Sequence, residues 1–204
     1  MNIFDVHIKN GEVIDGTGAP KFKSDIVINK GKIIGIFPAE NGDVRDPSEN
    51  HFLSNFRAKH TINAENKIIS PGFIDVHTHD DDNVFLDPSM SSKISQGVTT
   101  CVAGNCGISL APFSYKGEVP APIALLGKSE VFRFPRVSDY KEEFNNKPSS
   151  VNLALLTGHS MLRVEAMNGE FARPATTKEI SKMVDKLQLA LEDGSIGLST
   201  GLAY

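Results

Sequence analysis

The sequence has few of the features that mark export, membrane insertion or nucleic-acid binding. Its 204 residues include 25 acidic side chains against 21 lysines and arginines, so it lacks the basic surface that holds a nucleic-acid backbone. No apolar run approaches the ~18 residues of a membrane span. The N-terminus has no basic region followed by an apolar stretch, as a secretory signal would require. We therefore expect a cytoplasmic protein with no nucleic-acid or membrane partner.

Cysteine is also scarce, with only Cys101 and Cys106 in the chain. Without an export signal, a structural disulfide is disfavoured, and the cysteines are better interpreted as thiols or metal ligands. Cys101 lies inside an apolar, β-branched segment, which predicts that it packs in the core. Hydrophobic residues make up 40% of the sequence and charged residues 23%, as is typical of a folded domain.

The first part of the chain reads as short strands and turns. Apolar and polar side chains alternate over residues 4–9, the pattern of a half-buried strand. Asn10-Gly11 predicts a hairpin turn, and residues 26–36 predict a second hairpin. The polar stretch 38–61 is expected to be a long irregular excursion. Residues 1–66 are therefore predicted to form a small antiparallel β unit.

From residue 67 onward, strand-like segments alternate with helical ones. A helix is predicted over 177–193, where Thr176 and Glu179 can form a capping box and Gly194 follows as a stop. Repeated strand–helix alternation predicts a parallel sheet and an α/β fold for residues 67–204. The strand-like segments are 73–76, 98–103, 151–156 and 195–201.

Two histidines follow the first of these segments. His77 and His79 are two residues apart, so on an extended strand their side chains point the same way. Two imidazoles converging from one strand make half of a zinc site. The acidic triplet 80–82 could neutralise a metal charge, orient an imidazole through its second nitrogen, or simply be solvated.

Further polar residues follow the next strands. Cys106 lies between glycines after the second strand, and parallel strands end on the same side, so its thiolate is predicted to face the histidine pair. Sulfur beside imidazole favours zinc, although a small cysteine filling a tight turn is an alternative. His159 follows the third strand as a ligand, a substrate contact or a structural residue. Ser199 and Tyr204 could contact substrate or serve turn chemistry.

Together these residues resemble the amidohydrolase superfamily, and more closely the N-acyl-D-amino-acid deacylase (D-aminoacylase) family. Residues 8–18 are similar to the strands of the superfamily's N-terminal β-sandwich, and residues 70–80 to its first barrel strand with the metal-binding histidine pair. Segments 97–107, 158–163 and 194–204 narrow the resemblance to the deacylases.

The resemblance implies a fold and an activity. It implies a partial (β/α)8 TIM-type barrel of about four strands over 67–204, preceded by a small β-sandwich segment over 1–66. It also implies a zinc-dependent hydrolase with one or two ions, which cleaves N-acyl-D-amino acids, a class of small molecules, to a carboxylate and a D-amino acid. The metal ligands would be His77, His79 and Cys106. His159, Ser199 and Tyr204 stay candidate substrate contacts because of their positions at strand ends.

The chain is shorter than the family it resembles. Family members continue through four more strand–helix units, which carry further metal-binding histidines and a catalytic aspartate, so no acid–base residue is assigned here. We expect an incomplete N-terminal portion that self-associates or needs a C-terminal half as partner. Alternatives are a cyclic-amide hydrolase of the hydantoinase or dihydroorotase kind, and an inactive fragment that only binds metal or a partner.

Overall fold

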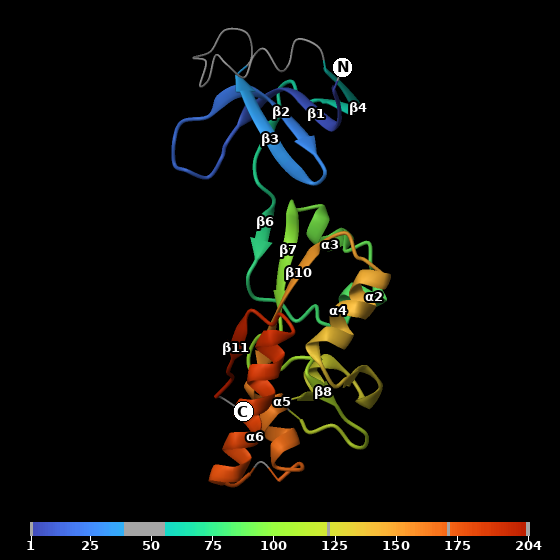
Figure 1. Cartoon of the computed structure of the whole chain (residues 1–204), viewed down its shortest axis with the longest axis vertical. Coiled ribbons are helices and arrows are strands. Elements are labelled where there is room, and N and C mark those ends of the chain that lie inside the picture. Colours follow the sequence, from blue (N-terminus) through green and yellow to red (C-terminus); the bar gives the residue numbers. More distant parts are fainter. Residues whose placement is uncertain (1, 39–55, 122, 171, 203–204) are drawn as a thin grey trace. The chain divides into compact units, whose positions relative to one another are not determined.

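The computed structural model describes residues 2–38, 56–121, 123–170 and 172–202. The chain divides into two compact units, Met1–Pro71 and Gly72–Tyr204, which are described separately below (Figure 1). Both contain a β-sheet, and all the residues predicted to bind metal belong to the second unit.

The first unit is one mixed sheet in the residues described. Its strand order is β3-β2-β1-β4, with the short β5 beside β1. β1 pairs antiparallel with β2 and β2 with β3, whereas β4 and β5 run parallel to β1. The second layer of the expected β-sandwich stays a prediction. The strands are β1 (Asn2–Val13), β2 (Phe22–Asn29), β3 (Lys32–Pro38), β4 (Phe56–Asn63) and β5 (Ile68–Ile69).

Three expectations for this unit are wrong. The sheet is not antiparallel throughout, because β4 and β5 pair in parallel with β1. Asn10-Gly11 does not form a hairpin, because β1 continues to Val13. Asn10, at a φ of 63°, lies in a bulge of β1 where the register with β2 shifts. An Asn-Gly pair suits a bulge as well as a turn, because both need a positive φ. The stretch 38–61 is not irregular throughout, since Phe56–Asn63 forms β4; residues 39–55 lie outside the described part.

The second unit contains a curled, wholly parallel sheet of four strands. Its strand order is β11-β10-β7-β6. The strands of this sheet therefore lie side by side in the order in which they follow one another in the sequence. The arrows of β6, β7 and β10 point the same way in Figure 1, which places their carboxyl ends at one edge. The predicted parallel α/β sheet is confirmed. The strands are β6 (Phe73–Asp75), β7 (Val98–Ala103), β10 (Asn152–Gly158) and β11 (Gly197–Ser199).

Helices and one small hairpin connect these strands. The predicted helix over 177–193 is α6 (Thr177–Glu192), and it begins with the expected capping box between Thr176 and Glu179. The helices of the described residues are all too short or too polar to cross a membrane. The remaining elements are α2 (Asn83–Leu86), α3 (Ser91–Ile94), the hairpin of β8 (Phe113–Ser114) and β9 (Arg133–Phe134), the 3-10 turns Ile123–Leu126 and Ser129–Val131, α4 (Val137–Asn146) and α5 (His159–Ala166).

The core of this unit packs against β7 and β10. Cys101 is fully buried within β7, as predicted. Tyr140 of α4 packs its ring 5.0 Å from the rings of both Phe85 and Phe134, and its hydroxyl donates to the carbonyl of Asp81 at 2.5 Å. The segment that follows the histidine pair is thereby fixed to α4 through a buried hydrogen bond.

Candidate metal centre

The histidine pair lies just after the end of β6. Thr78, between the two histidines, is buried, and its N–H and hydroxyl both donate to the carbonyl of Val102, at 3.1 and 3.3 Å. These bonds keep the segment beside β7, although the strand itself ends at Asp75 and the chain bends at His77. With Thr78 turned inward, His77 and His79 project to the exposed side, where their ring centroids are 5.9 Å apart.

Cys106 lies in a tight turn at the end of β7. It adopts a φ of 56°, between Gly104 at 80° and Gly107 at 78°. A Cβ at Gly104 would lie 2.1 Å from the carbonyl oxygen of Leu156, and one at Gly107 would lie 2.7 Å from the backbone nitrogen of Gly201. Only glycine allows this close approach with such backbone angles. The two glycines thus bring the half-buried Cys106 toward the sheet edge.

Two polar side chains fix this turn. The side-chain amide of Asn105 donates to the carbonyls of Val102, at 2.7 Å, and Thr78, at 3.2 Å, which links the cysteine turn to the histidine segment. The hydroxyl of Ser199 donates to the carbonyl of Gly104 at 2.5 Å and accepts from the N–H of Gly107 at 3.0 Å. Cys106 is therefore held from both sides.

His77, His79 and Cys106 are the one group of three such metal ligands within the described residues. His77 Nε2 lies 3.0 Å from Cys106 Sγ, and one ligand atom of each residue lies within 4.8 Å of the others. In a tetrahedral zinc site, two donors at the usual bond lengths are about 3.3–3.8 Å apart. The three side chains therefore lie close to one another but must rotate to reach a common ion, and this histidine–thiolate set suits zinc.

The three aspartates after the pair have separate environments. Asp80 forms an ion pair with Lys93 at 3.0 Å, and Asp82 lies 3.9 Å from Arg133. Asp81 is fully buried, and neither carboxylate oxygen accepts a well-directed hydrogen bond. Burial raises its pKa to about 6, although the backbone amides of Gly104 and Leu110 act in the opposite direction. Asp81 is therefore not solvated, which removes that interpretation for it.

The other residues expected at the site have different positions. His159 begins α5, directly after β10, and is half-buried; burial, and then the nearby charge of Arg163, lowers the pKa of its imidazole. Ser199 directs its hydroxyl into the turn that carries Cys106. Tyr204 lies outside the described residues. Contact of any of these three with substrate stays a prediction.

Sequence reasoning missed two residues that support this centre, Asn105 and Lys93. Asn105 precedes Cys106 in the turn bounded by Gly104 and Gly107. That position was the signal in the sequence that could have identified it as a residue supporting the turn. Lys93 lies on the helix α3 and meets Asp75 and Asp80 only after folding. Nothing in the spacing of these three residues indicates that contact.

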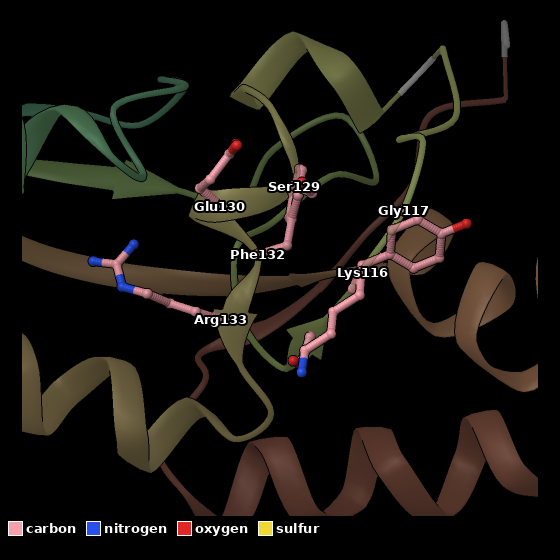
Figure 2. Close-up of a pocket in the computed structure, with 8 residues that line it drawn as sticks. Lys116, Gly117, Ser129, Glu130, Phe132 and Arg133 are labelled. Carbon is pink, nitrogen blue, oxygen red and sulfur yellow. The ribbon is translucent and has the colours of Figure 1, made fainter.

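A separate cavity of about 340 Å³ lies beside the β8–β9 hairpin (Figure 2). Its wall carries both signs of charge, from Lys116, Glu130 and Arg133. The guanidinium of Arg133 is already engaged by Glu143 at 2.8 Å and lies over the ring of Phe134. The residues that line the cavity include none of the candidate metal ligands, so we assign it no role.

Comparison with known proteins shows the family to which the chain belongs. A model of the amidohydrolase family matches residues 60–203. The chain is 40% identical over 202 residues to the D-aminoacylase of Alcaligenes xylosoxydans xylosoxydans, a match that covers 98% of this chain and 38% of the relative.

Solved structures are similar over the same part. The chain shares 41% identity and a TM-score of 0.84 with the crystal structure of a D-aminoacylase, over 98% of this chain and 39% of that one. It shares the same identity and TM-score with the N-acyl-D-glutamate deacylase of Bordetella bronchiseptica, over 100% of this chain and 39% of that one. That structure contains zinc and a phosphonate inhibitor that mimics the tetrahedral intermediate.

Proposed function

This chain belongs to the amidohydrolase family, and on that basis we propose that it carries part of the zinc site of an enzyme that hydrolyses N-acyl-D-amino acids to a carboxylate and a D-amino acid. The chain spans 38% of the length of the D-aminoacylase that it matches, and its hydrolytic activity is part of this proposal.

The observation that carries the proposal is the cluster of His77, His79 and Cys106 at the carboxyl edge of a parallel sheet. The edge beyond the carboxyl ends of the strands is where barrels of this class place their active sites. The cluster also lies within the segment that matches the family and the deacylase structures. Their spacing in the sequence and their geometry in the structure both support a site built on these three residues.

The chain's own residues perform the binding part of the chemistry. The imidazoles of His77 and His79 offer nitrogen donors, and Cys106 must lose its proton to bind a metal as thiolate. A zinc ion held there would polarise the amide carbonyl and activate water for attack. Asn105 and Ser199 keep the thiolate beside the imidazoles by fixing the turn from both sides. We assign no acid–base residue among the described residues.

Substrate recognition is proposed for His159, Ser199 and Tyr204. His159 follows β10 and Ser199 ends β11, so both lie at strand exits on the same side of the parallel sheet as the metal cluster. Because the pKa of His159 is lowered, its ring stays neutral near pH 7 and can offer one donor and one acceptor. A neutral imidazole suits an amide or a carboxylate of the substrate.

Metal binding without turnover is the second candidate for a polypeptide of residues 1–204, because the described residues supply the ligand cluster and no assigned acid–base residue. General acid–base catalysis contributes about 10²–10⁴-fold to a rate. A polypeptide of residues 1–204 that binds zinc but releases no D-amino acid from N-acetyl-D-glutamate or N-acetyl-D-methionine supports this candidate. Hydrolysis of hydantoin in place of these substrates would instead support a cyclic-amide hydrolase.

Zinc binding tests the proposal directly. We expect the wild-type chain to bind zinc, and Cys106→Ala to weaken the affinity at least about 10-fold, because the ion loses its only sulfur donor. His77→Ala is expected to act in the same direction. The affinities are measured by competition with a chromophoric chelator.

Cys101→Ala is the matched control, because it also removes one thiol but from the core. It is expected to leave zinc affinity unchanged while lowering thermal stability. Equal zinc affinity in the wild type and Cys106→Ala would contradict the proposed site.

A further inference from the structure

A single ammonium group joins the two ends of the histidine segment. Lys93 Nζ donates to Asp75 Oδ2 at 2.8 Å and lies 3.0 Å from Asp80 Oδ2. The contact with Asp80 is an ion pair, and that oxygen accepts no well-directed hydrogen bond. The side chain of Lys93 is 22% exposed and that of Asp75 33%, so the three charges are only partly shielded from water.

Each aspartate is connected in turn to the residues between them. Asp75 accepts the backbone N–H of His77 at 3.3 Å through its second oxygen, Oδ1. The N–H of Asp80 lies 3.4 Å from the hydroxyl of Thr78. Asp75, Thr78 and Asp80 therefore fix the backbone on which both imidazoles are mounted, and Lys93 joins the two outer residues of this set.

The charges within this set depend on one another. Burial alone would lower the pKa of the Lys93 ammonium, but its contacts with Asp75 and Asp80 outweigh burial and raise that pKa. The hydrogen bond from Lys93 in turn lowers the pKa of Asp75. Without the ammonium, two carboxylates would face each other with no cation between them, and repulsion would drive the ends of the segment apart.

We propose that Lys93 is a positioning residue of the metal centre: by holding Asp75 and Asp80 together, it sets the direction of His77 and His79 toward Cys106. The proposal rests on the zinc site proposed above. Lys93 acts through the backbone that carries the metal ligands.

The sign of the effect separates positioning from simple electrostatics. Removing a positive charge near a cation site strengthens zinc binding if charge alone matters. Removing the residue that orients the ligands weakens binding, by about 10-fold where outer residues of metal sites have this function. Lys93→Met therefore tests the two effects in opposite directions.

Zinc affinity of the full chain is measured by chelator competition for the wild type, Lys93→Met and Lys93→Arg. We expect Lys93→Met to weaken zinc binding about 10-fold. Lys93→Arg is expected to recover affinity, because a guanidinium can bridge two carboxylates. Lys59→Met is the control: it removes a lysine paired with Asp5 at 2.7 Å in the other unit, and it should not change zinc affinity.

If circular dichroism shows that Lys93→Met does not fold, a second variant tests the same contact. Asp75→Asn keeps the shape of the side chain and its acceptor for the His77 N–H, but weakens the pair with Lys93. It is expected to weaken zinc binding less than Lys93→Met does. The double variant of Lys93→Met and Asp75→Asn should bind zinc no more weakly than Lys93→Met alone, because both substitutions break the same ion pair.

Three outcomes overturn the inference. Zinc affinity above wild type in Lys93→Met would show that Lys93 contributes charge and not position, and affinity equal to wild type would show that Lys93 does not position the ligands. If Lys93→Met does not fold, unchanged affinity in Asp75→Asn has the same force. Failure of the wild type to bind zinc overturns the proposed metal site itself, and is distinguished from the other two because it appears before any substitution at Lys93.

Discussion

Cys101 and Cys106 have the same chemistry but opposite environments. Cys101 is fully buried in β7, and burial raises the pKa of its thiol. Cys106 is half-buried in a left-handed turn, with an imidazole nitrogen 3.0 Å from its sulfur. The sequence predicted this difference, because Cys101 lies within an apolar strand and Cys106 lies between glycines after that strand.

Thiol labelling should distinguish the two cysteines. With the chain folded and metal-free, iodoacetamide is expected to modify Cys106 much faster than Cys101, because reactivity follows exposure and thiolate character. Added zinc should protect Cys106, since a metal-bound thiolate is no longer available for attack. Peptide mass spectrometry after timed labelling gives both rates. Equal rates for the two cysteines, or no protection by zinc, would argue against the site.

The three candidate ligands could be found from sequence because each depends on local rules. Alternation along an extended segment sets the common direction of His77 and His79, and parallel strands place Cys106 at the same edge. Lys93 could not be found in this way. Its partners Asp75 and Asp80 are brought to it by packing of α3 against the sheet, which no spacing in the sequence encodes.

At the scale of elements, the first turn of α6 shows how closely a local signal can fix structure. The hydroxyl of Thr176 accepts the N–H of Glu179 at 3.3 Å, and the Glu179 carboxylate accepts the N–H of Thr176 at 2.7 Å. Arg173 adds two further bonds to the same carboxylate, at 2.7 and 2.9 Å. These bonds, with Arg173 first, lower the pKa of Glu179 well below its ordinary 4.5.

Acid should therefore weaken this cap through Glu179. A carboxyl with a depressed pKa in the folded state stabilises the fold above its unfolded pKa, and that contribution is lost as the pH falls toward the folded pKa. We expect Glu179→Gln to be less stable than the wild type at about pH 7, with the difference shrinking below about pH 4.5. Urea unfolding at several pH values measures it.

Thr176→Ala is the control for this titration. It should lower the free energy of unfolding by about 1 kcal/mol, as for other helix caps. Because the hydroxyl does not titrate, most of that loss should persist in acid. A Glu179→Gln deficit that stays constant across the pH range would mean that the ionised carboxylate contributes nothing to the cap.

Other elements show where local signals mislead. Periodicity and capping predicted α6, a β-branched apolar run predicted β7, and a buried-strand pattern over 151–156 predicted β10. Asn10-Gly11 predicted a turn, but Gly11 packs where a Cβ would lie 2.2 Å from Ile69, so pairing with β5 decides that β1 continues. β4 was missed because its exposed polar residues resemble a loop, and only its parallel pairing with β1 makes it a strand.

At the scale of the whole second unit, the sheet is open at both sides. β6 and β11 are its outer strands. Exposed apolar residues lie within each of these strands and directly beside it in the sequence. The outer face of α6 is also only partly covered, although Met183 packs against α5. The residues concerned, each at least 44% exposed, are Phe73, Ile74, Val76, Ile180, Val184, Leu191, Ile196 and Leu198.

The family fold explains why these strand edges are open. This chain matches structures with a TM-score of 0.84 while spanning 39% of their length, and its four strands pair in chain order. A closed barrel of this class has eight strands. A sheet of four such strands leaves two edges unpaired, and in the described residues these are the outer edges of β6 and β11.

A polypeptide of residues 1–204 made by itself should consequently self-associate. Unpaired strand edges and exposed apolar side chains template association between chains. No charged residue lies within 195–202 to oppose it on the side of β11. Sedimentation velocity over a range of micromolar concentrations is expected to show oligomers or aggregates, and co-expression with the remaining segment of a D-aminoacylase relative should suppress them. A monomer that unfolds cooperatively across this range would contradict the prediction, and would mean that the edges of β6 and β11 are stable without a partner.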